Sequence, residues 1–131
     1  ASDKQNADRA VVELKRISRD FKTPVLTLSS FSRAFYEKKA SMEAFKESGG
    51  IEYSADVLIG LNYTLEGKKK IKAQDGKTHE VTYIDTAASK KQDPRIVELT
   101  VLKNRRGESE VTLRYSYFSK NDLFEELARL D

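Results

Sequence analysis

Two stretches of alternating apolar residues near the end of the chain constrain its fold most. They flank a polar, basic segment at residues 103–109. The alternating residues are Val97, Leu99 and Val101 before this segment, and Val111, Leu113, Tyr115 and Tyr117 after it. A period of two is typical of strands that bury one face. The pattern therefore predicts a long β-hairpin with a basic tip.

A helix and a short apolar run lie near the start of the chain. Residues 8–21 place Ala10, Leu14, Ile17 and Phe21 on one face, which predicts an amphipathic helix. Asn6 or Asp8 is the expected N-cap, and the helix should end at Thr23-Pro24.

The apolar run at residues 25–29 predicts a buried strand directly after this helix. A helix followed by a buried strand is half of a βαβ unit, which favours the α/β class. Small polar residues and one base lie at the carboxyl end of this predicted strand, which is the end that faces the ligand crevice in open α/β sheets. They are Ser29, Ser30, Ser32 and Arg33.

A glycine-containing loop precedes the next apolar run. Residues 47–50 read Glu-Ser-Gly-Gly, and a short helical turn, Asp56 and a second buried strand at residues 56–61 should follow. Glycine lets backbone N–H groups approach an anion, so this loop is a candidate phosphate-binding element. Residues 33–46 mix aromatic and basic side chains, with a short helix expected from Ser41. They fit either a solvated loop or a surface for single-stranded nucleic acid.

The remaining chain predicts three local structures. Asp75-Gly76 is a strong turn signal for a hairpin between residues 70–73 and 80–84. Residues 85–94 are expected to form a loop, and residues 121–130 a short helix capped by Ser119 or Asn121.

Composition excludes several kinds of site. The 131 residues suit a single domain, and the absence of cysteine removes disulfides and cysteine-based metal sites. A net charge of +3 does not by itself establish nucleic-acid binding. No run reaches the roughly 18 apolar residues of a membrane span, and we expect a cytoplasmic protein.

No complete catalytic motif is present, because the chain has no phosphate-binding Gly-x-x-x-x-Gly-Lys-Ser/Thr stretch. The sequence also predicts no metal site. The basic tip at residues 103–107 fits either a solvated turn or a phosphate clamp.

In combination, four segments resemble the replicative DNA helicase family of the DnaB type. They are residues 9–20, 24–33, 45–56 and 103–107, in the order found in the second half of that family's RecA-like ATPase domain. The resemblance covers residues 8–61 and 96–118. It fades over residues 62–95, which look like a variable insertion.

The resemblance implies roles for individual residues. Lys103 and Arg105 match a pair that reaches across a subunit interface to the γ-phosphate of ATP. Lys46, Glu47 and Gly49 match a loop that holds single-stranded DNA. Ser30 and Arg33 match a region that senses nucleotide state, although the family usually has glutamine at the position of Ser30.

The resemblance also implies a larger assembly. The parent protein is expected to be a hexameric ATP-dependent helicase that uses ATP and Mg²⁺, translocates 5′→3′ on single-stranded DNA, and has a primase or helicase loader as a further partner. The P-loop half of the domain would precede this chain. We therefore expect a fragment that is inactive alone, binds no cofactor and self-associates through an uncovered strand edge. Two alternatives are a RecA-like ATPase of the recombinase or circadian-clock type and a non-enzymatic α/β module that binds nucleic acid.

Overall fold

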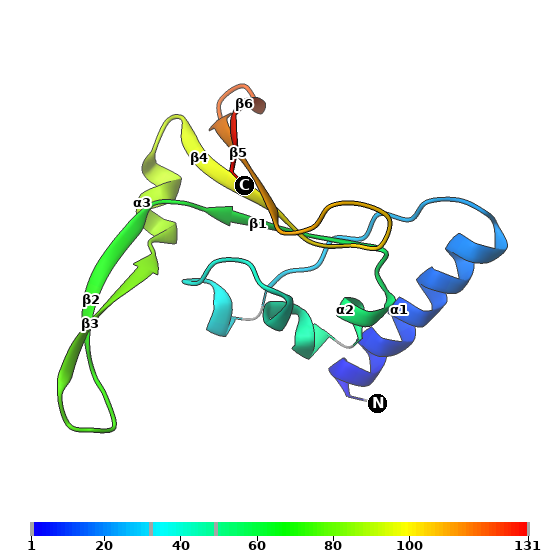
Figure 1. Cartoon of the computed structure of the whole chain (residues 1–131), viewed down its shortest axis with the longest axis horizontal. Coiled ribbons are helices and arrows are strands. Elements are labelled where there is room, and N and C mark those ends of the chain that lie inside the picture. The colour runs from blue at the N-terminus through cyan, green and yellow to red at the C-terminus, as the bar shows by residue number, and fades with distance from the viewer. Residues whose placement is uncertain (1, 32, 49, 131) are drawn as a thin grey trace.

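A four-stranded sheet and a separate two-stranded sheet form the β-structure of the protein (Figure 1). The computed structural model describes residues 2–31, 33–48 and 50–130. For residues 46–48 and 128–130 it describes the backbone only. The larger sheet has the order β1-β4-β5-β6, and the smaller pairs β2 with β3. The elements are α1 (Asp3–Asp20), η1 (Arg33–Phe35), η2 (Met42–Ser48), α2 (Ile51–Ser54), β1 (Val57–Tyr63), β2 (Glu66–Lys72), β3 (Thr78–Ile84), α3 (Thr86–Lys91), β4 (Arg95–Asn104), β5 (Val111–Phe118) and β6 (Leu123–Leu130). The fold is thus mixed α/β, and each pair of neighbouring strands in the two sheets is antiparallel.

The predicted long hairpin is confirmed as β4 and β5. Val97 pairs with Tyr115 and Val101 with Val111, so the two alternating sets share one register. The second predicted strand is confirmed as β1, which pairs antiparallel with β4. Its predicted burial is wrong, because Val57, Ile59 and Leu61 alternate along one face and are 50%, 45% and 56% exposed. The pairing of β1 with β4 places the start of β1 beside the end of β4, and the candidate functional site lies at this point.

The amphipathic helix is confirmed as α1, but its predicted cap is wrong. The backbone N–H of Gln5 donates to the Ser2 hydroxyl at 3.2 Å, and the Gln5 side chain accepts from the Ser2 N–H at 3.0 Å. This reciprocal capping box satisfies two helix-end donors and starts the helix at Asp3, upstream of Asn6 and Asp8. The helix ends at Asp20, shortly before Thr23-Pro24.

The predicted buried strand at residues 25–29 is wrong. In the described part of the chain this stretch is exposed and irregular, and the side chains of Leu26 and Leu28 are 91% and 92% exposed. A strand needs a neighbour for its N–H and C=O groups, and β1 pairs only with β4 among the described strands. The expected α-to-β half of a βαβ unit is therefore not formed within these residues.

Two further local predictions are also wrong. Residues 85–94 contain α3, because the Asp85 carboxylate accepts from the N–H of Ala88 at 2.9 Å and caps the helix. Within residues 121–130, where a helix is predicted, Leu123–Leu130 form the strand β6. The ring of Phe124 stacks on Tyr117 at 4.4 Å, and pairing with β5 overrides the helical preference of this segment.

A small core lies between β1 and the segment before it. Ala44, Phe45 and Leu58 are buried together, and the ring of Phe31 meets that of Phe45 edge-on at 5.2 Å. Gly60 permits the close approach of the preceding loop, since a Cβ there would lie 2.2 Å from that of Ala40. Aromatic residues thus pin part of residues 33–46 to the sheet, and the predicted short helix near Ser41 is confirmed as the 3₁₀ helix η2.

The hairpin β2–β3 projects from one end of the molecule, whereas α1 lies at the other (Figure 1). The predicted turn at Asp75-Gly76 is confirmed, with Gly76 in the left-handed region at φ 77°. At its base, the N–H of Asp85 donates to the Leu65 carbonyl at 2.8 Å. We call residues 66–84 the β2–β3 arm. Among the described residues, no helix is both long and apolar enough to cross a membrane.

Candidate functional site

The basic hairpin tip is held against the end of the short helix α2. Lys103 pairs with Leu58 in the sheet, and Asn104 pairs with Val57. Helix α2 ends just before β1, so this register brings Lys103 and Arg105 to its carboxyl end. The backbone also closes the contact, because the N–H of Arg105 donates to the Asp56 carbonyl at 3.0 Å.

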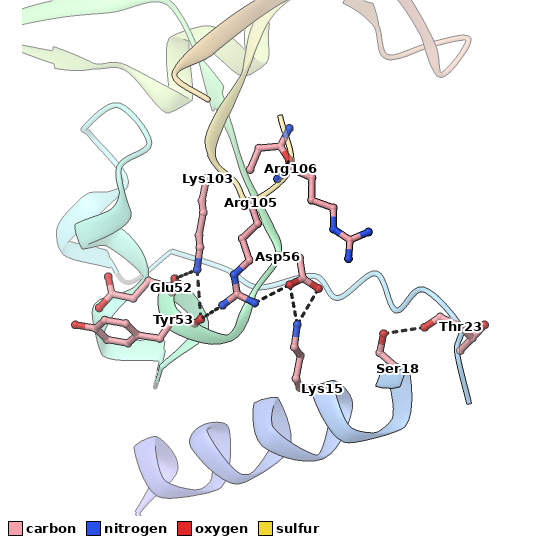
Figure 2. Close-up of polar contacts among 10 residues, drawn as sticks. Lys15, Ser18, Thr23, Glu52, Tyr53, Asp56, Lys103, Arg105 and Arg106 are labelled. Carbon is pink, nitrogen blue, oxygen red and sulfur yellow. Dashed lines mark hydrogen bonds and ion pairs between the residues drawn. The ribbon is translucent and has the colours of Figure 1, made fainter. Parts of the chain in front are cut away.

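Lys103 and Arg105 donate to backbone carbonyls of α2 (Figure 2). The Nζ of Lys103 lies 2.8 Å from the Glu52 oxygen and 3.3 Å from that of Tyr53. The Nη2 of Arg105 lies 2.7 Å from the same Tyr53 oxygen. The last carbonyls of a helix receive no hydrogen bond from N–H donors within the helix, and they favour nearby cations. The two side chains are thereby oriented together at the edge of the sheet.

Asp56 joins this pair to helix α1. One carboxylate oxygen accepts from Nη1 of Arg105 at 2.7 Å, and both carboxylate oxygens accept from Nζ of Lys15 at 2.8 Å. Figure 2 shows Asp56 between the two cations. The side chains of Lys15, Asp56 and Arg105 are 40%, 60% and 44% exposed. Ion pairs this exposed contribute little to stability, so an incoming anion can compete for Arg105.

The pKa of the Asp56 carboxyl lies below its ordinary value of 3.8, chiefly because Lys15 donates a hydrogen bond to it. Arg105 adds to this effect. A depressed carboxyl pKa stabilises the fold above the unfolded value, and this contribution is lost as the pH falls through the folded value. In an NMR titration, we expect Asp56 to titrate below 3.8 and the Lys15→Met substitution to raise its midpoint. An unchanged midpoint in Lys15→Met would contradict the Lys15–Asp56 contact.

The other predicted site residues do not join this cluster. Ser30 and Arg33 are exposed, and within the described residues no hydrogen bond or ion pair links either side chain to Lys103 or Arg105. The side chains of Lys46 and Glu47, and all of Gly49, lie outside the described residues. In the part of the chain that the structure describes, no group of three potential metal-binding side chains occurs.

Sequence reasoning missed the contribution of Lys15 and the pairing of Asp56 with Arg105. The relevant signal was the position of Asp56 directly before β1 and of Arg105 directly after β4. Only the register of the two strands shows that these residues meet. Arg106 is exposed, and its side chain points away from α2 without a drawn contact (Figure 2).

Comparison with known proteins agrees with a helicase domain. The model of the protein family described as "DnaB-like helicase C terminal domain" matches residues 2–126, and the chain belongs to this family. The chain is also 31% identical over 74 residues to "Replicative DNA helicase DnaB" of Mycoplasma genitalium. That match covers 54% of this chain but only 16% of the relative. No solved structure matches the chain.

Proposed function

We propose that this chain is part of a hexameric, ATP-dependent replicative DNA helicase with a RecA-like ATPase fold. In this proposal, the chain supplies Lys103 and Arg105 to the ATP of a neighbouring subunit. It also supplies a loop at Lys46, Glu47 and Gly49 to single-stranded DNA. Membership of the DnaB-like family supports the helicase assignment, and a primase or a helicase loader is a further proposed partner.

The observation that carries the nucleotide role is the paired cation cluster at the hairpin tip. A lysine ammonium and a planar guanidinium together suit phosphate oxygens, since arginine matches them in a bidentate way. Lys103 and Arg105 converge on the same Tyr53 carbonyl at 3.3 and 2.7 Å, so a common arrangement already orients both. These residues fit the γ-phosphate side of an ATP site, where bound ATP with Mg²⁺ would supply the phosphoryl group to be hydrolysed.

Asp56 balances the positive charge of Arg105 until a phosphate replaces Asp56 as the partner of the guanidinium. The carboxylate accepts one hydrogen bond from the guanidinium, and Lys15 donates to both carboxylate oxygens. When Arg105 turns to a phosphate on a neighbour, Asp56 keeps Lys15 as its partner. No buried charge is left unpaired by this exchange, because all three side chains are substantially exposed.

The proposal is tested by unwinding of a forked duplex with the intact protein. We expect strand separation that requires ATP hydrolysis and a free 5′ tail, and none with a non-hydrolysable ATP analogue. Tight, ATP-independent binding of single strands without unwinding would instead favour the non-enzymatic module. In that case the isolated chain should show a steep salt dependence, because each neutralised phosphate on a single strand contributes about 0.7 to the slope of log K against log salt.

A further inference from the structure

The β2–β3 arm carries a row of lysines on one of its faces. Lys68, Lys70 and Lys72 alternate along β2 and therefore point to the same side. Their spacing along the strand is roughly 7 Å, from a rise of about 3.4 Å per residue. Their partners across the hairpin are Thr82, Glu80 and Thr78. We call these six residues the lysine face.

The cations of this face are available to a ligand. All three lysines are exposed, and no hydrogen bond or ion pair involves the side chains of Lys70 and Lys72 among the residues that the structure describes. Lys68 lies 3.7 Å from Glu80, but these side chains are 70% and 57% exposed. An ion pair with this exposure and separation contributes little to stability, so the Lys68 side chain can turn to an incoming anion.

The opposite face of the arm contacts the rest of the protein through Lys69. There Lys69 pairs with Glu37, and its ammonium lies 4.7 Å from the centre of the Tyr83 ring. Gly67 lies directly against the same ring, where a Cβ would be 2.8 Å from it. The two faces therefore differ, because one carries an ion pair with the body of the protein, whereas the lysines of the other face have no such pair among the described residues.

We propose that the lysine face binds the phosphate backbone of duplex DNA, a contact beyond the single-strand and ATP contacts proposed above. Charge complementarity favours a polyanion, since regularly spaced lysines bind phosphates without reading bases. The face has no aromatic residue, whereas surfaces for single strands commonly stack bases on aromatic rings. A two-stranded ribbon is also narrow enough for the major groove of B-DNA, which is about 12 Å wide.

The test compares two double variants of the intact protein. Lys70→Gln/Lys72→Gln removes two charges from the lysine face. The matched control Lys4→Gln/Arg9→Gln removes two charges from exposed positions of α1. Fluorescence anisotropy measures binding to a mixed-sequence DNA duplex of about three helical turns over a range of salt concentrations.

We expect the arm variant to lower the slope of log K against log salt by about 1.8, or about 0.9 for each lost phosphate contact. Its affinity for the duplex at about 0.1 M salt should fall roughly tenfold or more, and the control should bind like wild type. A slope that does not change, or that falls equally in the control, overturns the proposal. ATP hydrolysis stimulated by single strands is measured in parallel, so failure of this inference is distinguishable from failure of the helicase function.

Site-specific crosslinking provides a second readout that does not depend on affinity. The chain contains no cysteine, so Thr82→Cys on the lysine face and Asn6→Cys on α1 can each carry a photoactivatable label at one site in this domain. We expect the Thr82→Cys label to crosslink to the duplex and the Asn6→Cys label not to do so. Crosslinking from neither position, or equally from both, overturns the proposal.

Discussion

Replacing Arg105 with alanine in the intact protein is expected to lower DNA-stimulated ATP turnover by about 10³- to 10⁵-fold. An arginine supplied by a neighbouring subunit stabilises charge that develops on the transferred phosphoryl group, so its loss affects kcat far more than nucleotide binding. Steady-state ATPase kinetics measure kcat, and binding of a fluorescent nucleotide checks that the site still fills. Turnover equal to that of wild type would contradict the proposed role.

Arg106→Ala is the matched control for this experiment. It removes the same charge from the next residue of the tip, and it leaves the contacts of Arg105 with Tyr53 and Asp56 in place. We expect turnover within a few-fold of wild type. A large loss in Arg106→Ala together with a small one in Arg105→Ala would move the role to Arg106.

Mixed assemblies then show whether Arg105 acts on its own subunit or on the neighbour. Arg105→Ala protein is mixed with a variant of the intact protein that cannot bind nucleotide. In a mixed ring, some interfaces combine a working nucleotide site with a working Arg105. ATPase activity above that of either variant alone is expected for action across the interface, and no gain would contradict it.

Replacing Arg114 with leucine is expected to destabilise the domain by about 3 kcal/mol. Glu98 is buried at 7% exposure, and one of its oxygens accepts from Nε and Nη2 of Arg114 at 2.9 and 2.7 Å. Removing the arginine leaves a buried carboxylate without its cross-strand partner. The effect should lie at the low end of the range for buried pairs, because the Arg114 side chain is itself 42% exposed. Urea unfolding followed by circular dichroism measures the change.

The double variant Glu98→Leu/Arg114→Leu shows whether the loss of stability comes from an unpaired buried carboxylate or from the lost packing of the Arg114 side chain. With both charges gone, no unpaired carboxylate remains buried, and most of the stability should return. If Arg114→Leu costs less than about 1 kcal/mol, the pair behaves like an exposed one and this account is wrong.

The sequence predicts best the parts of the fold that local pattern determines. Alternating residues predicted β4 and β5, and Asp75-Gly76 predicted the turn of the arm, because both depend on neighbouring residues. The segment that forms β6 is rich in leucine and glutamate, which favour a helix, but pairing with β5 decides its conformation. The apolar run at residues 25–29 resembles a buried strand, yet it has no neighbour among the described strands.

The candidate site could be predicted only in part, because local pattern does not show which distant residues meet. Lys103 and Arg105 were found through a resemblance that depends on adjacent residues. The contacts of Asp56 with Lys15 and Arg105 join residues that are 41 and 49 positions apart. Such contacts follow from strand register and from the placement of α1, which no local pattern in the sequence specifies.

The closed base of the β2–β3 arm has a consequence for how its length can vary. The N–H of Asp85 meets the carbonyl of Leu65 at 2.8 Å, so the chain leaves and re-enters the body of the protein at almost the same point. To the rest of the fold, the arm is a closed loop whose entropic cost grows only slowly with length, by about 0.6 kcal/mol per doubling. Insertions and deletions between these two residues should therefore leave the larger sheet and the hairpin tip almost unaffected.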